Sequence, residues 1–111
     1  MVSNSLIVVQ LGGAEAVFML GAADDADTVE NMDVEVTLGD GSRWSATLLT
    51  LAEIRRIMER WQRTGEGLSG AFFQCADLVI VDRGGIGAAV ELLSRLVNTE
   101  QIRETFVRVG T

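Results

Sequence analysis

The sequence predicts an α+β protein whose mainly antiparallel sheet has about six to seven strands in the order ββββαββαβ, with two helices packed on one face. Three observations lead to this fold class. The N-terminal segments are apolar or alternate between polar and apolar residues, two later segments carry apolar residues at helical spacing, and short glycine-containing connections separate them. The 111 residues fit a single domain over 1–111, in which an apolar hairpin and an acidic loop, 1–31, are added to a 32–111 core.

Residues 6–11 and 14–20 are predicted to be two strands of a hairpin, joined by the tight turn signal Gly12-Gly13. This loop places Val8 opposite Val17. Both faces of the hairpin are then apolar, which is typical of a strand at the centre of a sheet, beneath helices, or at a subunit interface. We therefore expect a homo-oligomer, with a dimer formed through this N-terminal hairpin.

Residues 32–38 and 42–48 alternate between apolar and polar and predict a second hairpin. A three-residue loop, 39–41, sets Val36 opposite Trp44 and keeps the apolar side chains on one face. A two-residue loop would mix the polar and apolar faces, so the three-residue register is preferred.

A helix is predicted to begin after Thr50, because Thr50 and Glu53 have the spacing of a capping box. Gly65 supplies its C-terminal stop. One face of this helix is apolar and is expected to pack on the sheet. It consists of Leu51, Ile54, Ile57, Met58 and Trp61.

The C-terminal half is predicted to contain a loop over 65–70, two strands over 71–74 and 77–81, a helix over 86–97 and a last strand over 102–109. The glycine turn that opens the second helix, 84–87, resembles a dinucleotide-binding loop only in part, because its third glycine position is occupied by Val90. Close packing of the helix start and binding of an anion both remain open for this turn.

The charge is strongly asymmetric: the residues before Arg43 sum to −8, whereas Arg43 and the residues after it sum to +1. Four carboxylates share one predicted loop, which we interpret as a candidate site for a basic protein partner. These are Asp24, Asp25, Asp27 and Glu30. Calcium binding by the loop is an alternative, although the spacing differs from that of an EF-hand.

The polar side of the first predicted helix is basic, and it is a candidate surface for an anion or an acidic partner. It carries Arg55, Arg56, Arg60 and Arg63. The alternative is a solvated face with local ion pairs, for example between Glu59 and its arginine neighbours.

The missing residue types exclude several chemistries. The chain has no His, Lys, Tyr or Pro, so it cannot form a Ser-His-Asp triad, a histidine zinc site or a lysine Schiff base. We therefore expect no enzyme activity, no cofactor and no metal, and the acidic composition argues against nucleic acid. The sequence has no signal peptide, no membrane-spanning run and the single cysteine Cys75, so a cytoplasmic location is expected.

The motifs TGEGLSG at 64–70 and DLVIV at 77–81, after the hairpin and helix, resemble a group of small uncharacterised bacterial α+β proteins. The resemblance covers about residues 32–97 and implies no functional residues. Some members of the group resemble immunity-type proteins, which implies a protein-binding role.

The expected function is therefore that of a non-catalytic cytoplasmic protein-interaction domain, with an immunity-like role implied by the resemblance. A self-assembling structural domain is one alternative. A carboxylate-based metal or small-ligand-binding protein is another, and it would use Asp24, Asp25, Asp27 and Asp77.

Overall fold

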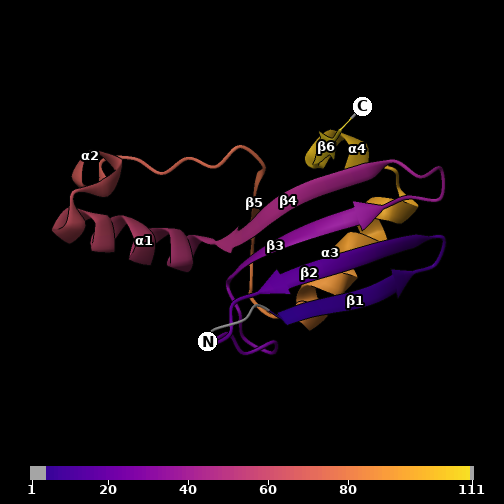
Figure 1. Ribbon diagram of the computed structural model, residues 1–111, viewed down its shortest axis with the longest axis horizontal. Coiled ribbons are helices and arrows are strands. Elements are labelled where there is room, and N and C mark those ends of the chain that lie inside the picture. The colour runs from indigo at the N-terminus through magenta and orange to yellow at the C-terminus, as the bar shows by residue number, and fades with distance from the viewer. Residues whose placement is uncertain (1–4, 111) are drawn as a thin grey trace.

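The computed structural model describes residues 5–110 and confirms an α+β fold with a mainly antiparallel sheet (Figure 1). The strands are β1 (Ser5–Leu11), β2 (Ala14–Leu20), β3 (Asn31–Thr37), β4 (Arg43–Thr50) and β5 (Leu78–Val81), in that order across the sheet. All neighbours are antiparallel except β4 and β5, which are parallel. The short strand β6 (Val107–Val109) pairs with the first residues of β4 on the same edge as β5.

Both predicted hairpin registers are confirmed. Val8 pairs with Val17 in the first hairpin, and Val36 pairs with Trp44 in the second. The loop of the second hairpin turns at Gly41, whose φ of +86° is the left-handed conformation that glycine adopts without steric cost.

The main hydrophobic core lies between the strands and the helix α3 (Ile86–Asn98), while Leu49, on the other face of β4, is buried outside this cluster. Leu93 is fully buried in the main core against strand residues such as Phe18 and Val34, which are also fully buried. Residues of β1 and β2 thus belong to the same core as the rest of the sheet.

The sequence predicted that two helices pack on one face of the sheet. Helix α3 does so, but the helix α1 (Leu51–Thr64) does not. Figure 1 shows α1 projecting beyond the end of β4 instead of lying on the sheet. Of its apolar residues only Ile57 is buried, and Leu51 is 68% exposed. The reason is the junction: Thr50 is both the last residue of β4 and the N-cap of α1, so no loop turns the helix back.

The segment labelled α2 (Glu66–Gly70) is a left-handed turn at the far end of α1, and we call α1 and α2 together the arm. Gly67, Leu68 and Ser69 have φ values of +59°, +52° and +60°. After this turn the chain runs back toward β5 without forming the predicted strand over 71–74. Phe73 instead stacks on Trp61 of the arm, with 5.6 Å between ring centroids.

The predicted last strand over 102–109 is also wrong in its first half. Ile102 and Phe106 are both buried, and their spacing of four residues is helical rather than extended. They accordingly bracket the short helix α4 (Ile102–Thr105), and the amide of Phe106 donates to the carbonyl of Ile102 at 2.9 Å. Only β6 remains as a strand.

The tight contact between α2 and α1 predicts that Gly70→Ala destabilises the fold more than Gly41→Ala. Both glycines have a positive φ, +80° and +86°, at which a non-glycine residue costs roughly 1–2 kcal/mol. A Cβ at Gly70 would in addition collide with the carbonyl oxygen of Met58, whereas a Cβ at Gly41 would meet nothing within 4 Å. Urea unfolding of the two variants measures the difference, and equal losses of stability would contradict the contact.

Candidate functional site

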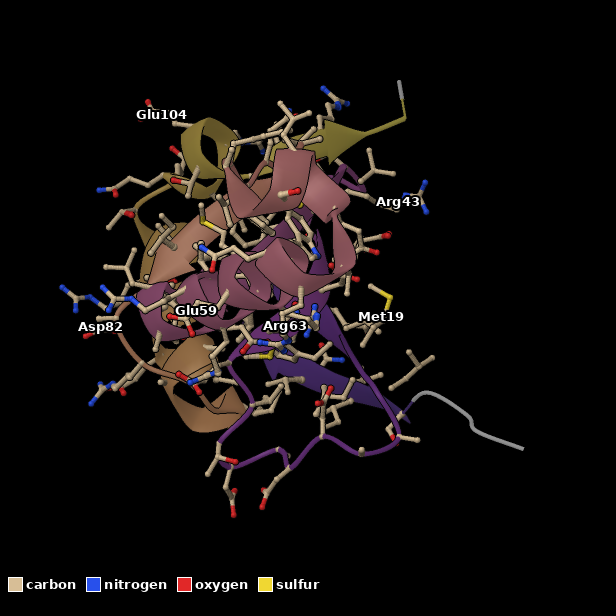
Figure 2. All side chains as sticks on the ribbon, turned by 90° about the vertical axis from the view of Figure 1, so that its left-hand side faces the viewer. Met19, Arg43, Glu59, Arg63, Asp82 and Glu104 are labelled. Atoms are coloured by element: carbon tan, nitrogen blue, oxygen red, sulfur yellow. The ribbon has the colours of Figure 1, made fainter. Side chains whose placement is uncertain are left out.

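One face of the sheet is not covered by a helix. In Figure 1 the strands pass in front of α3, so the face turned toward the viewer is the uncovered one, and we call it the open face. In Figure 2, Met19 and Arg43 both point to the side opposite α3. Residues that alternate with the core contribute to the open face: Leu6, Val8, Gln10, Glu15, Val17, Met19, Asp33, Glu35, Arg43, Ser45, Thr47, Ile80 and Val107.

The strongly exposed hydrophobic residues gather on the open face and the arm. Within residues 5–110 there are seven such large side chains, and none lies on α3. The open face has Leu6, Val8, Ile80 and Val107 at 47–65% exposure, and the arm with the residues that follow it has Leu51, Leu68 and Phe72 at 49–79%. Exposed apolar surface that is concentrated in this way is typical of an interaction site.

The centre of the open face is polar and acidic. Asp77 accepts hydrogen bonds from the hydroxyls of Ser45 at 3.0 Å and Thr47 at 2.8 Å. Burial raises the pKa of Asp77, but the hydrogen bonds from Thr47, Ser45 and Cys75 outweigh it and lower the pKa overall, so the carboxylate is ionised at neutral pH.

Few positive charges balance the carboxylates of this face. Arg43 pairs with Glu35 at 3.3 Å, and the open face carries four acids, Glu15, Asp33, Glu35 and Asp77, against this single arginine. The face therefore has a local charge of −3 and is acidic even with the acidic loop left aside.

The acidic loop lies against the start of α3. Its carbonyl oxygens at Ala26 and Val29 accept hydrogen bonds of 2.8 Å from the amides of Ile86 and Gly85. These backbone carbonyls satisfy amides at the helix start that have no partner within the helix. The loop thus has a structural role that the sequence did not indicate.

This packing also accounts for the glycine turn at 84–87. A Cβ at Gly84 would lie 2.6 Å from the carbonyl oxygen of Val29, so glycine permits the close approach of the loop. The amides of Gly85 and Ile86 already donate to the loop, so an anion at these two groups would have to displace its carbonyls.

The four candidate acids of the loop do not form one site. Asp24 accepts from the amide of Gly21 at 2.7 Å, and Asp25 accepts from the amide of Asp27 at 2.8 Å, as is common for aspartates that stabilise turns. Within residues 5–110 no cluster of three or more Cys, Asp or Glu side chains is arranged to hold a metal ion.

Glu30 differs from these aspartates, because it joins the acidic loop to the arm. It accepts a hydrogen bond of 2.8 Å from Thr50 and forms an ion pair with Arg56, which also binds Glu53 at 2.9 Å. The hydrogen bond from Thr50, followed by that from Arg56, lowers the pKa of Glu30. The structure therefore joins Glu30, from the predicted acidic loop, to Arg56, from the predicted basic surface of α1.

The other arginines of the candidate basic surface are Arg55, Arg60 and Arg63. In the part of the chain that the structure describes, none of the three forms an ion pair within 4 Å, and the suggested local pairs with Glu59 are not formed. Figure 2, which looks toward the tip of the arm, labels Glu59 and Arg63. With four arginines and two glutamates, α1 has a charge of +2. Because the whole chain has a net charge of −7, the residues outside α1 sum to −9.

Comparison with known proteins identifies no relative: no family model, no curated protein and no solved structure matches the chain. None of the helices described within residues 5–110 is long and apolar enough to cross a membrane. The geometry of the arm and the open face is therefore the basis for any functional assignment.

The pKa of Glu30 predicts a specific pH dependence of stability. Because folding lowers this pKa below its ordinary value of 4.5, the contribution of Glu30 is fully present above that value and is lost as the pH falls through the folded pKa. Thermal unfolding measured from neutral to acidic pH should show a weaker pH dependence for Glu30→Gln than for the wild type. Glu104→Gln, at an exposed position, is the control, and a Glu30→Gln curve parallel to the wild type would contradict the prediction.

Proposed function

We propose that the protein is a non-catalytic cytoplasmic protein-interaction domain that binds another polypeptide through its arm and its open face. The observation that carries this proposal is the distribution of exposed hydrophobic side chains, which gather on these two surfaces. Burying them against a partner would contribute roughly 25 cal/mol per Å² of apolar surface removed from water.

The tip of the arm supports the proposal independently. Leu68 has φ and ψ of 52° and 48°, a left-handed conformation that costs a leucine roughly 1–2 kcal/mol. Its side chain is nevertheless 79% exposed, so no burial within the chain offsets this cost. A strained backbone that presents an apolar side chain to solvent is typical of a binding surface.

The chemistry of the open face favours binding over catalysis. Its polar centre combines hydroxyls and carboxylates that bind one another, such as Ser45 and Thr47 with Asp77. The sequence offers no histidine or lysine as a general base or nucleophile beside them. An apolar border around charged residues is, in contrast, common in protein interfaces.

The immunity-like role implied by the sequence resemblance would require a basic partner. The charge of the open face would attract such a partner, and the association rate would then fall with increasing salt concentration.

Site-specific photo-cross-linking in cells that express the chain tests the proposal. A photoreactive amino acid at Leu68 or at Val8 should yield covalent protein adducts, because both positions lie at the proposed interface. The same amino acid at Glu91 or Glu104, exposed positions outside the arm and the open face, is the matched control. Absence of adducts from both Leu68 and Val8, or equal yields from the control positions, would overturn the proposed function.

A further inference from the structure

We propose that the partner is a second copy of this chain: two copies form a reciprocal dimer in which the arm of each lies on the open face of the other. This inference rests on the proposed function and names its partner. It concerns the region between β4 and β5, where the chain leaves the sheet and returns to it.

The topology assigns the open face to a crossover helix. Because β4 and β5 are parallel neighbours, the chain from 51 to 77 is a crossover connection, and the helix of such a connection normally packs on the sheet. Since α3 already covers one face of the sheet, the face left for a crossover helix is the open face, and Figure 1 shows α1 beyond the end of β4 instead.

The junction at Thr50 prevents α1 from taking that place on its own sheet. Thr50 pairs with Val81 in β5, and its hydroxyl accepts from the amide of Glu53 at 3.1 Å. Turning α1 back over the sheet would need connecting residues between strand and helix, typically about two to six. None are present, so the open face remains uncovered in a single copy.

Charge complementarity favours a second copy as the occupant. Helix α1 carries +2 and the whole arm, with Glu66 of α2, carries +1, while Arg55, Arg60 and Arg63 form no ion pair within the described residues. The open face carries −3, with Asp33 and Glu35 near its centre. An arm from a second copy would therefore meet charges of opposite sign, together with exposed apolar side chains like its own.

The dimensions of the two surfaces also agree. The 14 residues of α1 span about 21 Å, and strands of seven residues span about 24 Å. Five neighbouring strands are about 19 Å wide, enough for one helix with its side chains. A dimer with a twofold axis contains this contact twice. Two modest contact areas can then add up to the roughly 1,600 Å² that a stable interface buries.

A charge-exchange experiment tests the reciprocal dimer. We expect sedimentation of the wild type to give twice the 12.0 kDa of one chain. Reversing charges on the arm, R60E/R63E, or on the open face, D33R/E35R, should each raise the dimer dissociation constant at least about tenfold. Mixing the two variants should restore the dimer, because one contact is then wild-type on both sides and the other is reversed on both sides.

The control variant E91R/E104R carries the same change of charge as D33R/E35R, at exposed positions outside the arm and the open face, and its dimer should be unaffected. A monomeric wild type, a dimer indifferent to both charge reversals, or a mixture that stays monomeric would each overturn the inference. A dimer that is indifferent to the reversals would instead point to pairing along the free edge of β1.

A second measurement needs no change to the open face, in case D33R/E35R fails to fold. Isotopically labelled chains with the photoreactive amino acid at Leu68 are mixed with unlabelled chains, and the cross-linked peptides are identified by mass. Adducts joining Leu68 to open-face peptides of the other isotope support the dimer. Adducts to other proteins only would overturn the dimer and leave the proposed function standing, whereas absence of all adducts would overturn both.

Discussion

The hydrogen bonding of Thr50 is the constraint on which the rest of the structure depends. Its hydroxyl accepts from the amide of Glu53 and donates to the carboxylate of Glu30, and its amide donates to the carbonyl of Glu30 at 3.2 Å. Thr50 is 4% exposed, so its own polar groups depend on these bonds rather than on contact with water. One residue thereby fixes the end of β4, the start of α1 and the position of the acidic loop, and the direction of the arm follows from it.

Because the arm leaves the sheet, the two faces of the sheet have different roles. The face under α3 holds the core, and its alternating residues such as Phe18, Val34 and Ala46 are fully buried. The open face has the same alternation, but apart from Leu49 at the end of β4 its apolar side chains are at least partly exposed and remain available for contacts with another molecule. Stability and interaction are thus assigned to opposite sides of one sheet.

Much of the fold was predictable, because the relevant signals are local. Period-two alternation and glycine positions determined both hairpin registers, and the spacing of Thr50 and Glu53 located the start of α1. A capping box gives no information on where a helix points, however, so the exposed arm was missed. The strand predicted over 71–74 failed because an apolar run pairs as a strand only where a neighbouring strand is within reach.

The candidate site was predictable only in part. The apolar character of both faces of the first hairpin signalled that Leu6 and Val8 need a cover that the fold does not supply. The carboxylates of the acidic loop did not indicate that backbone carbonyls of the loop would bind the start of α3. Every residue has a backbone carbonyl, so composition cannot show which of them bind. The contact of Arg56 with Glu30 joins segments far apart in sequence and required the tertiary structure.

The edge of β4 is shared by two strands from the C-terminal half, with β6 along its first residues and β5 along its last. During synthesis β1 to β4 can therefore form as a meander of local hairpins while the outer edge of β4 still has no partner. That edge is completed only when the distant segments dock. The order in which the ribosome releases the chain thus leaves an interval in which strand pairing between nascent chains competes with closure of each sheet.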